Sequence, residues 1–168
     1  ITHAHPDHVG GLVDSAMAPV FRKAIVRMSD KEWTFMKNEA GAKAIAAAVK
    51  TQVKTFEPGR PVLPGITPIP LPGHTPGHVG YVIVSQGHEL IDIGDIVHSA
   101  IVSLARPAWT IKWDSDKDEA VVTRRHELQK LASSHRLMFA PHFPFPGVGR
   151  IEPAGKGFRF RPEIPASR

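Results

Sequence analysis

The chain has 168 residues, enough for one domain with a hydrophobic core and too few for two ordinary domains. Hydrophobic residues make up 42% and charged residues 22%, which disfavours disorder, and no apolar run approaches the roughly 18 residues of a membrane-spanning helix. The net charge is +5, but the basic residues are scattered, so we expect neither a nucleic-acid nor a membrane partner. The absence of cysteine excludes disulfides, thiolate zinc sites and cysteine nucleophiles.

The first residues are unlike a natural start, because Ile1 and Thr2 lead straight into a histidine cluster without an initiator methionine or a signal peptide. They are typical of a strand that has been cut near its end. We therefore interpret residues 1–168 as a single domain that lacks its N-terminal strands, and we expect any targeting segment to lie outside this sequence.

The expected elements alternate between strands and helices. A strand end and loop at 1–8 are followed by a short helix at about 10–18, and the capping-box spacing of Ser29 and Glu32 predicts a second helix start. The later expectations are a strand at 24–28, an Ala-rich helix at 42–53, an edge strand at 65–71, strands at 79–85 and 88–94, an extended segment at 109–113, a helix from Asp116 to about Ser133, a strand at 136–140 and a hairpin at 149–162. This mixture predicts an α/β (α+β) fold class with functional groups on loops at strand ends.

Four metal-competent groups lie within the six residues HAHPDH. In an extended stretch His3 and His5 point to the same side and can hold one ion, while Pro6 stiffens a turn that brings Asp7 and His8 back to the same pocket. Imidazole and carboxylate groups suit Zn²⁺ and similar ions. A run of imidazoles around a carboxylate has no evident packing purpose, so we interpret this segment as a metal site.

A second histidine cluster, HTPGH, lies between two expected strands. His78 lies at the start of the strand 79–85, which makes it the better candidate ligand. We interpret His74 as a supporting group that bonds Thr75 or a carboxylate.

Single candidate ligands end two later strands. Asp95 follows Gly94 at the end of HELIDIG, and its two oxygens can bridge two cations. His142 follows the apolar strand RLMFA and Pro141. Asp92 is expected on the opposite face as a structural or surface group.

The remaining candidates concern the pocket wall. His98, three residues after Asp95, is a candidate contact at the rim of the pocket. Apolar residues that could line the pocket wall, with packing in the core as an equal alternative, are Trp33, Phe35, Met36, Phe143 and Phe145. His88, His126 and His135 are expected at the surface.

In this order the motifs resemble the signature of the metallo-β-lactamase superfamily: HxHxDH, a lone His, a bridging Asp and a last His. The resemblance implies an αββα sandwich, present here as a truncated fragment that lacks about the N-terminal third. It also implies two divalent metal ions. The implied ligands are His3, His5 and His78 on the first ion and Asp7, His8 and His142 on the second, with Asp95 and a water or hydroxide between them. The phrases THAHPDHVGGL, GHTPGHVGYVIVSQG, IGDIVH, PHFPFPGVGRI and GKGFRF further resemble the methyl parathion hydrolase-like branch.

The resemblance implies hydrolysis of an ester-type small molecule: a phosphotriester, a lactone or an aryl ester. Zinc is the favoured metal, with Mn, Fe or Co as alternatives. Asp7 and Asp95 are the candidate catalytic carboxylates, Asp7 as a group that orients hydroxide or shuttles a proton. His5 stands where oxygen-reducing diiron members carry Glu, which favours hydrolysis. A thioester hydrolase of the glyoxalase II type, a mononuclear-iron sulfur dioxygenase, a non-catalytic metal-binding domain and a homodimeric assembly stay open.

Overall fold

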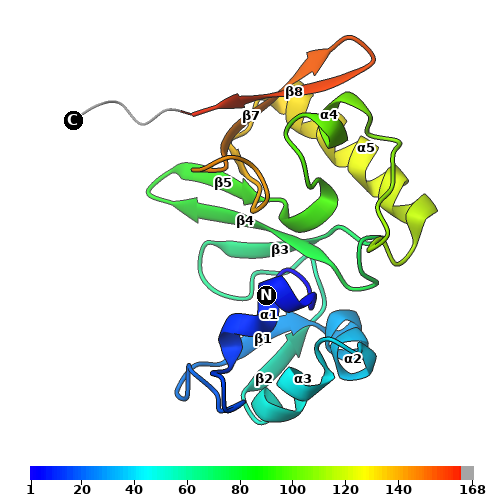
Figure 1. The fold of residues 1–168 in the computed structure, drawn as a ribbon. Coiled ribbons are helices and arrows are strands. Elements are labelled where there is room, and N and C mark those ends of the chain that lie inside the picture. Colours follow the sequence, from blue (N-terminus) through cyan, green and yellow to red (C-terminus); the bar gives the residue numbers. More distant parts are fainter. Residues whose placement is uncertain (164–168) are drawn as a thin grey trace.

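The structure is a computed structural model that describes residues 1–163 and contains two sheets, each with its own helices (Figure 1). In chain order the elements are α1 (Pro6–Val9), η1 (Gly10–Leu12), β1 (Val26–Ser29), α2 (Asp30–Asn38), α3 (Lys43–Val49), β2 (Val53–Phe56), β3 (Ile66–Pro70), β4 (Val79–Ser85), β5 (His88–Asp92), η2 (Gly94–Ile96), α4 (Val102–Ala105), α5 (Lys117–Ser134), β6 (Met138–Phe139), β7 (Val148–Ala154) and β8 (Gly157–Pro162). This mixed arrangement confirms the predicted α/β fold class.

The smaller layer consists of the parallel pair β1–β2 and the helices α2 and α3, at the bottom of Figure 1. Its core is a cluster of buried apolar side chains that includes Met28, Met36 and Ile45, together with Ala4 and Val9 from the start of the chain. The first residues of the chain are therefore packed into this layer, which fixes the backbone of the HAHPDH segment.

The larger layer is a six-stranded sheet with the order β3-β4-β5-β6-β7-β8. Only β5 and β6 pair in parallel, and every other neighbouring pair is antiparallel. Helix α5 packs against β7 and helix α4 against β8. The second core, between α5 and this sheet, includes the fully buried Leu104, Leu128, Met138 and Ile151.

Three local expectations were wrong. The first helix covers Pro6–Val9 rather than 10–18, because Pro6 takes a first-turn position where its missing N–H is not needed. The Ala-rich helix ends at Val49, and the chain turns into β2 at Val53. The segment 109–113 contains a turn rather than an extended strand. In residues 1–163 no helix is both long and apolar enough to cross a membrane.

The N-cap of α5 generates a stability prediction. The Asp116 side chain accepts a hydrogen bond from the backbone N–H of Glu119 at 2.9 Å. We expect Asp116→Ala to lower the free energy of unfolding by about 1 kcal/mol, because one N–H in the first turn loses its partner. Asp116→Asn is the matched control, since Asn caps about as well. Equal losses in the two variants, measured by urea denaturation, would contradict the cap.

Candidate metal centre

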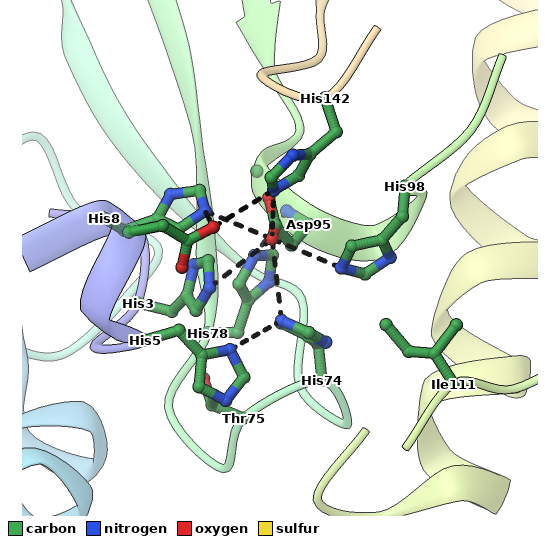
Figure 2. Close-up of polar contacts among 12 residues, drawn as sticks. His3, His5, His8, His74, Thr75, His78, Asp95, His98, Ile111 and His142 are labelled. Atoms are coloured by element: carbon green, nitrogen blue, oxygen red, sulfur yellow. Dashed lines mark hydrogen bonds and ion pairs between the residues drawn. The ribbon is translucent and has the colours of Figure 1, made fainter. Parts of the chain in front are cut away.

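Five histidine rings converge on the carboxylate of Asp95, which itself lies in η2 at the end of β5 (Figure 2). They come from the start of the chain, the β3–β4 loop, the segment after η2 and the segment after β6. The distances from their Nε2 atoms to Asp95 Oδ2 are 3.6 Å for His3, 3.2 Å for His8, 3.7 Å for His74, 3.3 Å for His98 and 3.0 Å for His142. Residues 3 and 142 thus meet in one small space.

The potential ligand atoms form three overlapping groups in which all atoms lie within 4.8 Å of one another. The groups are His3, His5 and His74; Asp7, His8, Asp95 and His142; and His74, Asp95 and His98. His3, His74 and Asp95 are buried, whereas Asp7 and His142 are exposed. The cluster therefore has a buried inner end and an outer end open to solvent.

The inner end fits a cation because its polar atoms lack partners. Among the described residues, the buried atoms His3 Nε2 and Asp95 Oδ1 have no hydrogen-bond partner. Burial, with a further contribution from the nearby His78 ring, holds the pKa of His3 far below its usual range, so its imidazole is neutral. A neutral imidazole and an ionised carboxylate without partners are the donor types that divalent transition metals bind.

The charge balance around Asp95 supports this interpretation. Burial by itself raises the pKa of Asp95, but hydrogen bonds from His8 and His98 outweigh burial and hold this pKa below its usual range. Burial likewise lowers the pKa of His8, but hydrogen bonding to Asp95 and the charge of that carboxylate outweigh it and raise this pKa. An anion at the centre of the histidine rings is thus the stable form of Asp95.

The structure places His74, rather than the expected His78, beside His3 and His5. Both ring nitrogens of His78 are occupied: Nδ1 donates to the Leu71 carbonyl at 2.9 Å, and Nε2 accepts from the backbone N–H of Asp95 at 3.0 Å. Burial lowers the pKa of His78 to about 3, so both bonds belong to a neutral ring. His78 therefore positions Asp95, while His74 lies with His3 and His5, its Nε2 2.9 Å from His5 Nδ1.

Gly94 makes the contact between His78 and Asp95 possible. It has a φ of +48°, and a Cβ at this position would lie 2.5 Å from His78 Nε2. Glycine is therefore required here both for the backbone conformation and for the close approach of the ring.

His74 is held from behind by a buried ion pair that the sequence analysis missed. Its Nδ1 lies 3.0 Å from Asp114 Oδ1, and the guanidinium of Arg124 lies 3.2 Å from the other carboxylate oxygen. Arg124 also donates to the carbonyls of Ile96 and Trp109, which ties the loop carrying Asp114 to α5. Burial by itself raises the pKa of Asp114. The hydrogen bonds to His74 and to a backbone N–H, together with the charge of Arg124, outweigh burial and lower this pKa, so the carboxylate is ionised. A carboxylate on the far nitrogen of a histidine fixes the ring for a metal ion.

Glu32 is the second buried carboxylate that was missed as a site residue. It lies in the first turn of α2, is 0% exposed and contacts the backbone of both histidine-bearing loops. Its capping-box spacing with Ser29 indicated only a helix start. No local pattern indicates that its side chain contacts residues 4, 75 and 77.

The expected apolar wall is largely absent. Met36 and Phe143 belong to the two cores, Trp33 packs against the smaller core, and Phe145 is 99% exposed. The ring centroid of Phe35 lies 6.1 Å from that of His5. The cavity beside the cluster has a volume of about 490 Å³. It is lined by His5, Pro6, Asp7, His74, Asp95, His98, Trp113 and His142. Trp113 is therefore the aromatic side chain at this cavity.

Comparison with known proteins is consistent with this geometry. The model of the metallo-beta-lactamase superfamily matches residues 1–142. The fold superposes with a TM-score of 0.91 on AidC, described as a dizinc quorum-quenching lactonase in complex with a product, at 28% identity. It superposes with a TM-score of 0.87 on AbOPH, described as a hydrolase in the beta lactamase superfamily, at 32% identity. In both cases 97% of this chain is covered.

A curated relative is the uncharacterized protein YobT of Bacillus subtilis (strain 168), which is 27% identical over 135 residues and covers 72% of this chain. The chain spans 57% of YobT, 63% of AidC and 62% of AbOPH, about three fifths of each relative's length.

The buried ion pair behind His74 generates a second prediction. We expect Asp114→Ala to lower the free energy of unfolding of the metal-free protein by about 3–5 kcal/mol, because it leaves the guanidinium of Arg124 buried without its partner. Asp114→Asn should cost less, since an amide oxygen still accepts a hydrogen bond. Asp118→Ala, at an exposed position of α5, is the control. A loss for Asp114→Ala no larger than for this control, in chemical denaturation, would contradict the pair's structural role.

Proposed function

Because the chain belongs to the metallo-β-lactamase superfamily, we propose that the protein is a dinuclear-metal hydrolase of ester-type substrates. The observation that carries the proposal is the position of Asp95, whose carboxylate lies between two sets of ligand-type side chains. A carboxylate can bridge two cations because each of its oxygens has free lone pairs.

The proposed ligands follow the geometric groups. His3, His5 and His74 would hold the inner ion, and Asp7, His8 and His142 would hold the outer ion, with the carboxylate of Asp95 available to both. His98, at 3.3 Å from Asp95, faces the same cavity and is proposed to contact substrate or Asp95. We favour zinc, because the donors are nitrogen and oxygen only and AidC is described as a dizinc enzyme.

The chemistry divides between the ions and the protein. When bound, the two ions lower the pKa of a coordinated water and polarise the substrate oxygen. Asp7 is 59% exposed at its side chain, and its carboxylate lies 3.5 Å from His8 and 3.6 Å from His142. It is therefore placed to orient a water molecule and to accept a proton at the open end of the site. The buried His3 and Asp95 keep the inner end free of bulk solvent.

The substrate class is proposed to be a lactone, an aryl ester or a phosphotriester. The similarity to a lactonase and to another hydrolase supports ester-type chemistry. The phrases GHTPGHVGYVIVSQG and PHFPFPGVGRI support placement in the methyl parathion hydrolase-like branch.

The direct test is metal analysis combined with turnover assays. We expect close to two metal ions per chain and hydrolysis of at least one of an acyl-homoserine lactone, an aryl acetate and a phosphotriester, lost on chelation and restored by Zn²⁺. Fewer than one ion per chain together with no metal-dependent turnover would contradict the proposal. Thioester hydrolysis alone, or an iron-dependent uptake of oxygen, would instead support the alternative activities of this fold.

The proposed assignment of His74 as a ligand gives a fourth prediction. His74→Ala should reduce zinc affinity by at least about 100-fold, the upper end for loss of a supporting residue, because it removes a ligand itself. His126→Ala is the matched control, since that side chain is 73% exposed and outside the cluster. Isothermal titration of the two metal-free variants with Zn²⁺ measures the difference. Equal zinc affinity would contradict the assignment of His74.

A further inference from the structure

We infer that Glu32 is a positioning residue that sets the spacing between the two loops carrying His3, His5 and His74. The inference rests on the proposed metal-dependent function. Neither the motif of the superfamily nor the HTPGH segment includes this residue, which lies in α2 on the smaller layer.

The carboxylate of Glu32 joins two loops that are distant in the sequence. Its Oε1 accepts a hydrogen bond from the backbone N–H of Ala4 at 2.7 Å. Its Oε2 accepts from Thr75 Oγ1 at 2.7 Å and from the backbone N–H of Gly77 at 3.0 Å. Ala4 lies between His3 and His5, and Thr75 follows His74, so one rigid group holds both ligand-bearing backbones.

Helix capping does not explain this carboxylate. In a capping box the Glu side chain returns to the backbone N–H of the N-cap residue. Here the three partners of Glu32 are Ala4, Thr75 and Gly77, while the Ser29 hydroxyl alone caps the helix by accepting from Glu32 N–H at 3.1 Å. The side chain of Glu32 is thus committed to the loops.

The start of α2 packs closely against the loop that carries His74. The Ser29 hydroxyl donates to the Gly77 carbonyl at 2.6 Å. A Cβ on Gly77 would lie 2.1 Å from the backbone nitrogen of Glu32. The absence of a side chain at Gly77 lets the helix approach closely, and the position of the loop then follows that of Glu32.

This spacing matters for metal binding because coordination tolerates little displacement. The ligand atoms of His3, His5 and His74 lie within 4.8 Å of one another. Nitrogen–zinc bonds are about 2.0–2.1 Å long, and plausible sites keep them within about 0.2 Å. A shift of either loop by more than this amount separates His74 from the other two rings.

Replacing the carboxylate by an amide tests the role without changing the size of the side chain. Three donors converge on the two oxygens of Glu32, whereas Gln offers one oxygen and one NH₂ group. In Glu32→Gln the NH₂ group faces the backbone N–H of either Ala4 or Gly77, neither of which can accept, so one loop loses a backbone hydrogen bond and moves away.

The experiment compares wild type, Glu32→Gln and a stability control in titrations of metal-free protein with Co²⁺. We expect Glu32→Gln to remain folded, to bind Co²⁺ about 10–100-fold more weakly and to show an altered visible absorption spectrum. Ile45→Val, which removes one methylene from α3 in the core of the smaller layer, should lower stability while keeping the wild-type affinity and spectrum. Wild-type affinity and spectrum in a folded Glu32→Gln protein would overturn the inference.

Two further measurements keep the test decisive. If Glu32→Gln does not fold, Thr75→Val removes one of the three hydrogen bonds at nearly constant shape; unchanged Co²⁺ affinity in that variant would also overturn the inference. Hydrogen exchange of metal-free Glu32→Gln should show faster exchange at residues 2–5 or 73–78 than in wild type. Failure of wild type to bind Co²⁺ contradicts the proposed function, whereas unchanged exchange in Glu32→Gln contradicts the role of Glu32, so the two failures are distinguishable.

Discussion

The buried carboxylate of Asp95 imposes the constraint on which the rest of the site depends. Its Oδ2 atom lies within 3.7 Å of five imidazole nitrogens, and its other oxygen has no partner among the described residues. Five rings can approach one carboxylate only from different directions. They come from four segments of the chain, and both sheets must be in place before the cluster exists.

Three parts of the cluster are fixed by buried polar contacts. His78 binds the backbone of Asp95, Asp114 binds the ring of His74, and Glu32 binds the backbone beside His3. Buried polar groups are costly unless their hydrogen bonds are made, so these contacts favour one arrangement of the loops over all others. The geometry of the cluster is thus set by residues outside the proposed ligand set, with Arg124 extending the network to α5.

The sequence was most informative where the structure is local. Alternation and turn residues predicted β4 at the observed residues, and Asp116 marked the start of α5. The spacing HxHxDH predicted a cluster of ligand-type groups. The sequence was less informative about the histidine positions within HTPGH, because the direction of each ring depends on loop geometry, including the φ of +119° at Gly73. The contacts of Glu32 and Asp114 were not predictable, since their partners lie 28 to 45 residues away along the chain.

These sequence separations also bear on the order of events during folding. Helix α2 can form from its own residues, but the three bonds of Glu32 require the closure of loops of 28, 43 and 45 residues. Loop closure costs conformational entropy that is offset only when the distant contacts form. A partly folded chain can therefore retain its helices without the histidine cluster, and the arrangement of the rings reports on completed tertiary structure rather than on secondary structure.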